Sequence, residues 1–201
     1  LDKHKHWGSV VDAYDPVMKA SEWCRDQVKT VNTNPEDVKN VIQTHLHLDH
    51  SGAIGHFPNA THITQRIEYD YAFNPDWFSQ PAYIREDFDK PNIRWKFLQG
   101  KKTDYYDVYG DGVIKIIFTP GHTPGHQSVL INLPKTGHML LTGDACYTGD
   151  HWCDRCLPGL VASASDAADS VAKLRKIAKE TNAKVVWGHD PVTWLDWNKA
   201  P

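Results

Sequence analysis

The sequence has neither a long apolar run nor a dense basic segment, and these two absences exclude broad classes of protein. No stretch of about 18 apolar residues occurs, so the sequence predicts no membrane-spanning helix. No run of Lys and Arg is longer than the pair Lys101–Lys102, and the net charge is -3 with His neutral. Because a nucleic-acid groove needs clustered positive charge, we expect neither a nucleic acid nor a membrane as a partner.

A secretory signal peptide is also missing, and the first residue is Leu1 rather than Met. We interpret the sequence as a trimmed chain or a part of a longer protein, and we expect a cytoplasmic location from the residues present. The 201 residues, of which 40% are hydrophobic and 23% charged, are typical of a globular protein with a buried core. We therefore expect a single domain over residues 1–201.

Cysteine is scarce, with four residues, whereas histidine is abundant, with 12. Only Cys153 and Cys156 have the C-x-x-C spacing of a structural zinc site or a redox pair, and the sequence has no second pair with this spacing. We therefore interpret Cys153 and Cys156 as reduced thiols near the surface. The histidines raise a different question, which is whether they cluster along the chain.

Alternating apolar residues and β-branched residues predict strands through much of the chain. The expected strands come in runs, with helices between and after them. This order favours a sheet-rich mixed α/β (α+β) fold over an alternating parallel barrel. The expected strands cover residues 41–44, 61–64, 95–98, 104–109, 113–119, 127–133, 138–143 and 183–188.

Two longer segments carry helix signals. Pro16 at a first helical position, with Asp15 as the cap, predicts a helix over residues 16–31. Apolar residues spaced along one face predict another helix over residues 165–179. Shorter expected features are a helix that begins at Ser51–Gly52, a helix over residues 66–73 and an irregular segment over residues 74–92.

The strongest chemical signal is one run of six residues, His45-Leu46-His47-Leu48-Asp49-His50. The run follows an expected strand, and a loop at this point lets the four polar side chains surround a small volume. Imidazole suits zinc and iron, and a carboxylate adds charge to hold a second divalent ion. The leucines are expected to point away and anchor the loop. A lone histidine is usually structural, but three histidines and one aspartate in six residues indicate a metal site.

Three further polar residues lie just past the ends of expected strands. His122 follows the strand over residues 113–119, within a loop over residues 120–126 whose Gly and Pro content forbids regular structure. Asp144 and His189 each follow a later strand. Strand ends at one edge of a sheet are where catalytic loops are usually built. We therefore expect these three side chains to be further metal ligands.

The four segments together resemble the metallo-β-lactamase superfamily. HxHxDH, a His in TPGHTPGH, an Asp in TGDA and a His in the final GHD are specific as a set, and they extend from about residue 40 to residue 191. The resemblance implies the metallo-β-lactamase fold, a four-layer αββα sandwich with the metals at one edge of the paired sheets. It also implies earlier N-terminal strands, including an Asp-Thr-Gly-like turn, and this sequence lacks those first strands.

The resemblance further implies a ligand set for two divalent metal ions, and Zn²⁺ is the metal that we expect. The first ion would be bound by His45, His47 and His122. The second ion would be bound by Asp49, His50 and His189, with Asp144 as a bridge between the two ions. His126 lies in the same loop as His122, and we expect it to orient the ligands rather than bind metal.

Within the superfamily, the sequence is similar to the N-acyl homoserine lactonases. Zinc β-lactamases usually carry Cys, Ser or His where this sequence has Asp144. Hydroxyacylglutathione hydrolases continue into a helical substrate domain, and the nuclease branch usually carries basic or extra domains. The lactonases place a tyrosine three residues after the bridging Asp, and Tyr147 stands there. The structural alternative for Tyr147 is a packed aromatic side chain.

This resemblance implies a hydrolase that opens a lactone ring, with an N-acyl homoserine lactone as the expected substrate. A metal-bridging hydroxide would attack the ester carbonyl. Tyr147 would stabilise the developing oxyanion, and Asp49 would pass a proton to the leaving oxygen. No G-x-S-x-G motif occurs, in agreement with attack by water rather than by a protein nucleophile.

Three other interpretations stay open. The chain is alternatively a hydrolase of another small cyclic ester, carbamate or lactam, or a metal-binding protein without turnover. A nuclease is the third interpretation, and the acidic balance of the sequence counts against it. Four aromatic residues are candidates for a substrate pocket or for a homodimer face, namely Trp77, Phe78, Tyr83 and Trp152.

Overall fold

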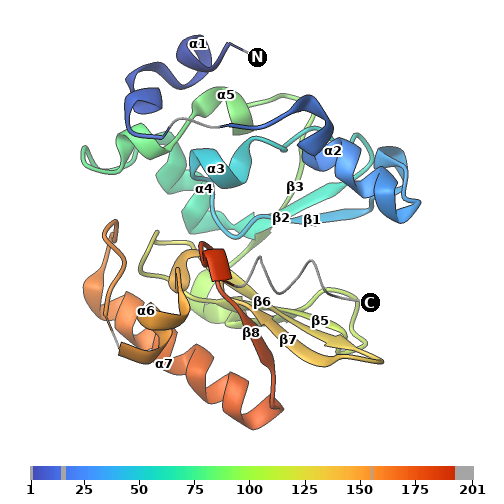
Figure 1. Ribbon diagram of the computed structural model, residues 1–201, viewed down its shortest axis with the longest axis vertical. Coiled ribbons are helices and arrows are strands. Elements are labelled where there is room, and N and C mark those ends of the chain that lie inside the picture. The colour runs from blue at the N-terminus through green and yellow to red at the C-terminus, as the bar shows by residue number, and fades with distance from the viewer. Residues whose placement is uncertain (1, 15–16, 155, 193–201) are drawn as a thin grey trace. The chain divides into compact units, whose positions relative to one another are not determined.

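The computed structural model describes residues 2–14, 17–154 and 156–192. The chain forms two compact units. Unit 1 consists of Leu1–Thr64 and Tyr69–Phe97, and unit 2 consists of Gln65–Glu68 and Leu98–Pro201. Figure 1 shows the helices and strands of each unit, coloured from the N-terminus to the C-terminus. The single domain expected over residues 1–201 stays a prediction.

Unit 1 contains a three-stranded sheet with the strand order β1-β2-β3. The strands are β1 (Asn40–Ile42), β2 (Thr61–Gln65) and β3 (Arg94–Leu98). β1 and β2 run parallel, with Val41 opposite His62. Each strand overlaps an expected one. β2 is the most buried of the three, as its β-branched residues predict.

Short helices make up most of the rest of unit 1. They are α1 (Lys3–Trp7), η1 (Gly8–Asp12), η2 (Ala20–Glu22), α2 (Cys24–Gln27), η3 (Val28–Val31), η4 (Pro35–Asp37), α3 (Leu48–Ser51), η5 (Gln80–Ala82) and α5 (Arg85–Phe88). α4 (Arg66–Phe73), which belongs to unit 1 from Tyr69 on and to unit 2 before it, coincides with the helix expected there. A buried apolar cluster is formed by Leu46, Ile54, Ala72, Tyr83 and Phe88.

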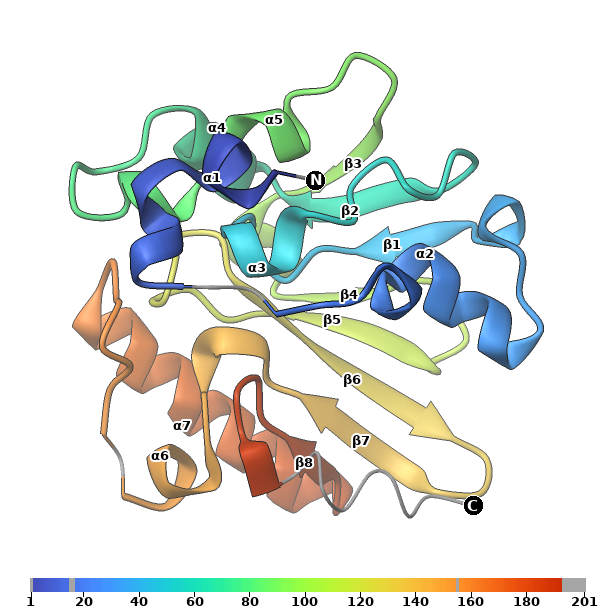
Figure 2. The same cartoon turned by 45° about the horizontal axis from the view of Figure 1, so that its top comes forward.

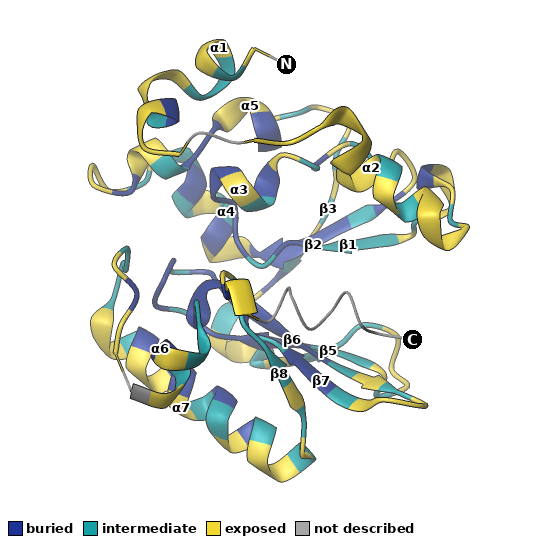
Figure 3. Cartoon of the chain, in the orientation of Figure 1, coloured by how far each residue is buried: buried dark blue, intermediate teal, exposed yellow. Residues whose placement is uncertain are grey.

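The helix expected over residues 16–31 is wrong as one continuous element. Its first residue, Pro16, and its expected cap, Asp15, lie outside the described residues. The rest forms η2, α2 and η3, with Trp23 between the first two in an extended conformation (φ -63°, ψ 140°). None of these three elements contains a buried residue, and Figure 3 shows α2 as largely exposed. A long helix draws its stability from packing an apolar face, and this segment buries no such face.

Unit 2 contains a five-stranded sheet with the order β4-β5-β6-β7-β8. Its strands are β4 (Tyr105–Asp107), β5 (Ile114–Phe118), β6 (Gln127–Leu133), β7 (Gly137–Leu141) and β8 (Lys184–Val186). All five lie where strands were expected, and β6 has the expected bounds. The pairs from β4 to β7 are antiparallel, whereas β7 and β8 are parallel. β5, β7 and β8 therefore run in the same direction.

The longest helix of unit 2 is α7 (Ala164–Thr181), which confirms the helix expected over residues 165–179. The hydroxyl of Ser163 caps its N-terminus by accepting a hydrogen bond from the backbone N–H of Asp166, and Asn182 ends it in a left-handed conformation. Its buried residues recur every three or four positions, and its remaining positions are mostly exposed (Figure 3). Unit 2 also contains η6 (Gly100–Thr103), η7 (Gly143–Ala145) and α6 (Gly149–Asp154).

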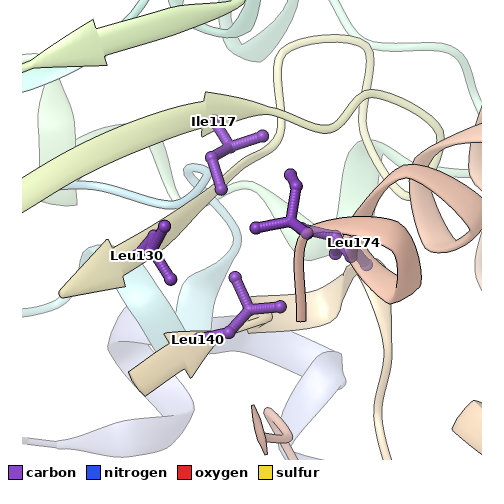
Figure 4. Close-up of a cluster of buried hydrophobic side chains, with 6 residues drawn as sticks. Ile117, Leu130, Leu140 and Leu174 are labelled. Carbon is purple, nitrogen blue, oxygen red and sulfur yellow. The ribbon is translucent and has the colours of Figure 1, made fainter. Parts of the chain in front are cut away.

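The core of unit 2 lies between the sheet and α7, which runs beside the strands in Figure 2. Leu174 of α7 points toward Ile117, Leu130 and Leu140, which come from three adjacent strands (Figure 4). All four side chains are buried. This packing fixes the direction of the strands, and so it fixes the positions of the loops that follow them.

Across the described part of the chain, no helix has both the length and the apolar character needed to cross a membrane.

Candidate metal centre

The histidine-rich run of unit 1 leaves β1 and enters α3. Asp49 and His50 lie within this helix, so the loop expected for all four polar residues is wrong for these two. The helix begins at Leu48 rather than at Ser51, since the carbonyl of His47 accepts hydrogen bonds from the backbone N–H groups of His50 (3.0 Å) and Ser51 (2.9 Å). The short helix therefore turns Asp49 and His50 back toward the residues that precede it.

The side chains of this run separate as the sequence predicts. Leu46 is fully buried in the apolar cluster of unit 1, and Leu48 is also buried. The imidazole rings of His45 and His47 lie 4.5 Å apart, and those of His45 and His50 lie 4.2 Å apart, centroid to centroid. The two buried leucines hold the segment in place, and the three imidazole rings lie close to one another.

Asp49 completes the group in unit 1. Its Oδ2 atom lies 3.4 Å from Nε2 of His50. Two ligand atoms that share a zinc ion in tetrahedral geometry lie about 3.3 Å apart, because each bond is about 2.0 Å long. The spacing of this carboxylate oxygen and this imidazole nitrogen therefore fits a shared metal ion. We call His45, His47, Asp49 and His50 the unit 1 cluster.

The other three expected ligands lie at one edge of the sheet in unit 2. His122 follows β5, Asp144 lies on η7 after β7, and His189 follows β8. Because these three strands run in the same direction, their carboxyl ends share an edge. The expectation that strand ends bring these residues to one place is confirmed within unit 2.

The carboxylate of Asp144 lies close to both of these histidines. Its Oδ2 atom is 3.2 Å from Nε2 of His189 and 3.5 Å from Nε2 of His122. Both distances are near the spacing of about 3.3 Å for atoms that share a tetrahedral zinc ion. One carboxylate oxygen is thus at ligand spacing from two imidazoles, as a bridging role requires. We call His122, Asp144 and His189 the unit 2 cluster.

Contacts at the far side of the His122 ring orient it within the unit 2 cluster. Nδ1–H of His122 donates a hydrogen bond to the carbonyl of Leu160 at 2.9 Å, so Nε2, the nitrogen that faces Asp144, carries the lone pair. The hydroxyl oxygen of Tyr147 lies 3.3 Å from the same Nδ1, and its ring packs 5.1 Å from that of His189. Tyr147 therefore lies beside the cluster, where the sequence placed it.

His126 occupies the orienting position expected for it. Its Nδ1–H donates to the carbonyl of Thr119 at 3.1 Å, and its Nε2 accepts a hydrogen bond from the backbone N–H of Asp144 at 3.0 Å. Both ring nitrogens are thus bonded to the protein, and the side chain is fully buried. The hydrogen bond to Asp144 holds the backbone that carries its carboxylate.

Two polar side chains that the sequence analysis did not single out contact the segments of the unit 2 cluster. Nδ1 of His151 accepts a hydrogen bond from the backbone N–H of Tyr147 at 3.2 Å. Burial, reinforced by the charge of Arg175, lowers the pKa of His151, which favours the neutral ring that this contact needs. The other side chain is Glu68, which contacts the loop around His122. No sequence signal marked either residue, because α6 was not expected and α4 showed only a helix pattern.

The cysteines divide into two environments. Cys153 and Cys156 are free and exposed, which confirms them as thiols near the surface, and Cys24 is free and exposed as well. Cys146 is also free, and its side chain is buried. Burial raises the pKa of Cys146 to about 12, and its thiol is therefore protonated at neutral pH.

The Metallo-beta-lactamase superfamily model matches residues 14–189. The chain belongs to the metallo-β-lactamase superfamily. Its mixed α/β structure with two sheets is the fold of this superfamily, as the resemblance implied. Imidazole and carboxylate donors at the spacings above are a set that can hold divalent metal ions.

Within this superfamily, the chain is similar to curated relatives that are N-acyl homoserine lactonases. The N-acyl homoserine lactonase AttM of Azorhizobium caulinodans is 58% identical over 200 residues, which covers 100% of this chain and 76% of the relative. AttM of Agrobacterium fabrum is 57% identical with the same coverage. An N-acyl homoserine lactonase of Bacillus cereus is 36% identical over 81% of this chain and 60% of its own.

The chain is also similar to solved structures of N-acyl homoserine lactone hydrolases. An N-acyl homoserine lactone hydrolase with the product N-hexanoyl-L-homoserine bound at its catalytic metal centre has a TM-score of 0.77 and 30% identity. The match covers 92% of this chain and 68% of that one. AiiA of B. thuringiensis, with N-decanoyl-L-homoserine at its active site, gives the same values.

Proposed function

We propose that this protein hydrolyses the lactone ring of N-acyl homoserine lactones at a centre that holds two divalent metal ions, with Zn²⁺ as the resident metal. The observation that carries the proposal is the 58% identity to a named N-acyl homoserine lactonase over the whole chain. Two structural neighbours at 30% identity hold N-acyl homoserines, which are the ring-opened products of such lactones.

The ligand assignment follows the family pattern and rests on the geometry inside each cluster. His45, His47 and His122 would hold one ion, whereas Asp49, His50 and His189 would hold the other. Asp144 would bridge the two ions, which its position 3.2 Å from His189 and 3.5 Å from His122 supports. When bound, a pair of divalent ions lowers the pKa of water toward neutrality and polarises a carbonyl oxygen.

Tyr147 supplies a hydrogen-bond donor for the oxygen that gains negative charge when the ester carbonyl is attacked. Its hydroxyl lies 3.3 Å from Nδ1 of His122, so it is already placed beside a ligand. Its backbone N–H is bonded to His151, and its ring contacts the ring of His189. A donor fixed in this way needs little reorganisation as charge develops, which is why such donors contribute strongly to catalysis.

Asp49 moves the proton that ring opening requires. Cleavage of the ester bond leaves an alkoxide on the homoserine side chain, and that oxygen must be protonated. The side chain of Asp49 is 45% exposed, which gives its carboxylate access to a substrate. It therefore combines a ligand role with that of general acid.

The proposal is tested by offering the purified protein, with Zn²⁺ added, four substrates in parallel. They are an N-acyl homoserine lactone, a cyclic carbamate, a β-lactam and a phosphodiester. Ring opening of the lactone, followed as proton release in weakly buffered solution, is the expected result. An ester is a better electrophile than an amide and has a better leaving group, and the chain shows no basic run for a phosphodiester.

The other outcomes discriminate among the alternatives. Faster opening of the carbamate than of the lactone contradicts the lactone as substrate, but it is compatible with a centre that holds two metal ions. Cleavage of the phosphodiester alone contradicts the substrate class. Two bound metals with no turnover of any of the four substrates favours a non-catalytic metal-binding protein.

Two further expectations belong to this proposal. A homodimer face and a substrate pocket are the two roles open to the exposed aromatic residues, of which Trp77 is 85% and Phe78 is 42% exposed, whereas Tyr83 is buried in unit 1. The mass of the protein measured in solution by light scattering tests the homodimer, and a monomer contradicts it. The cytoplasmic location stays a prediction, which cell fractionation tests.

A further inference from the structure

Glu68 is a buried carboxylate at the start of α4 that reaches a loop far along the chain. Its side chain is fully buried, and Gln65–Glu68 belong to unit 2. The neighbouring Gln65 is held there as well, because its amide donates to Oε1 of Gln127 at 2.7 Å and accepts the backbone N–H of Gly100 at 2.8 Å. The first turn of α4 is therefore fixed within the unit that contains His122.

The carboxylate of Glu68 accepts two hydrogen bonds from the loop over residues 120–126. The hydroxyl of Thr123 donates to Oε2 at 2.6 Å, and the backbone N–H of Gly125 donates to the same oxygen at 3.1 Å. The shorter distance is typical of a hydroxyl bonded to a charged carboxylate, which is among the stronger hydrogen bonds in proteins. The loop has no regular structure of its own, so contacts of this kind must determine its conformation.

The two backbones also touch at this point. A Cβ atom placed on Gly125 would lie 2.4 Å from the backbone nitrogen and from Cβ of Glu68. Only glycine permits this close approach, because any larger residue would push the loop away from α4. The carboxylate of Glu68 and the absence of a side chain on Gly125 therefore both keep the loop against α4.

The opposite end of the loop is held by α7 and the residues that precede it. The hydroxyl of Ser170 donates to the carbonyl of Pro120 at 2.6 Å. The backbone N–H of Ala162 donates to the carbonyl of Gly121 at 2.8 Å, and a Cβ on Gly121 would meet the backbone of Ala167 at 2.3 Å. His122 thus stands between a segment held by α7 and a segment held by Glu68.

We propose that Glu68 is a positioning residue for the metal centre, since it fixes Thr123 and Gly125 and so keeps Nε2 of His122 directed at Asp144. This inference rests on the proposed role of His122 as a metal ligand. Groups that orient metal ligands typically contribute 10–100-fold to metal affinity, and we expect an effect of about this size here. Glu68 itself is not assigned to bind metal or substrate.

The test measures metal binding rather than turnover. Glu68→Ala, Glu68→Gln and the wild type are compared by the visible absorption of the Co²⁺-loaded protein and by competition with a chelator for Zn²⁺. Glu68→Ala should change the Co²⁺ spectrum and weaken Zn²⁺ binding about 10–100-fold. Glu68→Gln retains an oxygen that accepts the same two hydrogen bonds, so it should restore most of the spectrum and of the affinity.

A second pair of variants keeps the inference testable if Glu68→Ala fails to fold. Thr123→Val removes the hydroxyl donor while it preserves the side-chain volume, whereas Thr123→Ser keeps the donor. Thr123→Val should weaken Zn²⁺ binding more than Thr123→Ser does. Glu180→Ala, at an exposed glutamate of α7, is the matched control and should leave both readouts unchanged.

Unchanged Co²⁺ spectra and Zn²⁺ affinities in both Glu68→Ala and Thr123→Val would overturn the inference. Asp144→Ala, measured beside them, separates this result from a failure of the proposed function. If Asp144→Ala loses metal and the Glu68 and Thr123 variants do not, only the positioning role is wrong. If none of these variants affects metal binding, the metal assignment itself is wrong.

Discussion

Oδ2 of Asp144 lies 3.2 Å from Nε2 of His189, although the two residues are 45 positions apart in the sequence. Two parallel neighbours, β7 and β8, bring them together, because each residue follows the carboxyl end of one of these strands. The same oxygen is 3.5 Å from Nε2 of His122, which follows β5. The sheet of unit 2 thus places one carboxylate between two imidazoles, and this placement is the structural basis for a bridging ligand.

Replacement of the bridging carboxylate should release metal. Asp144→Ala is expected to bind at least one ion fewer per chain and to lose turnover, because one carboxylate serves both ions. Metal content by mass spectrometry and lactone hydrolysis measure the two effects. Asp169→Ala, at an exposed carboxylate on α7, is the control and should behave as the wild type. Full metal content with normal turnover in Asp144→Ala would refute the bridging assignment.

Removal of the tyrosine hydroxyl should affect turnover and not metal content. Tyr147→Phe is expected to keep both ions and the fold while kcat falls about 10–1,000-fold, as for the loss of an oxyanion donor. Steady-state kinetics at saturating lactone, together with metal analysis, separate the two readouts. An unchanged kcat would show that Tyr147 is a packed aromatic residue rather than a catalytic one.

The two ions should differ in how easily a chelator removes them. Among the ligands proposed for the second ion, Asp49 is 45% and His189 is 43% exposed at the side chain. Of those proposed for the first ion, His45 is 0% and His122 is 3% exposed. A chelator should therefore release zinc in two phases, followed with a zinc-sensitive dye. A single phase that removes both ions together in the wild type would contradict this assignment of the ligands.

Acid should destabilise unit 1 through His62, whose side chain is buried in β2. Neither of its ring nitrogens has a hydrogen-bond partner among the described residues. Burial, with a smaller effect of the positive charge on Lys90, lowers the pKa of His62 to about 4 from its usual value of 6.5. The unfolded chain therefore binds more protons than the folded chain between pH 6.5 and pH 4, and stability falls as the pH falls through that window.

The corresponding experiment compares wild-type protein with His62→Leu after metal removal. From pH 7 to pH 5, the wild type should lose about 2 kcal/mol more free energy of unfolding than the variant does. Urea denaturation at each pH measures this difference. Equal losses in the two proteins would show that His62 is protonated equally easily in the folded and the unfolded chain.

Strands rich in apolar and β-branched residues were predictable from the sequence, because such residues favour burial within a sheet. β6 was expected at its observed bounds, and Leu130 shows why: it is an apolar residue that packs on the core of unit 2 (Figure 4). The expected helix over residues 16–31 failed for the opposite reason. Its propensity and cap signals were present, but the segment buries no residue within its helical turns, so nothing in the fold demands a continuous helix.

The proposed ligand residues could be singled out in the sequence because their types and their places after strands carry chemical information. The residues that contact and orient these ligands were harder to identify from the sequence. His126 was expected in that role because it shares a loop with His122, and its bond to Asp144 places it there. The contact of Glu68 joins residues 55 positions apart and that of His151 joins residues 4 positions apart, and neither spacing marks these side chains in the sequence.

The most direct test of the central claim is the rate of lactone opening as Zn²⁺ is added back to the metal-free protein. N-hexanoyl homoserine lactone is the substrate, and proton release in weakly buffered solution gives the rate after each addition. Because the proposed reaction uses ligands of both ions and the carboxylate that joins them, the rate should rise until two equivalents per chain are bound and then stay constant. Full activity at one equivalent, or a rate that does not depend on metal, would contradict the dimetal mechanism.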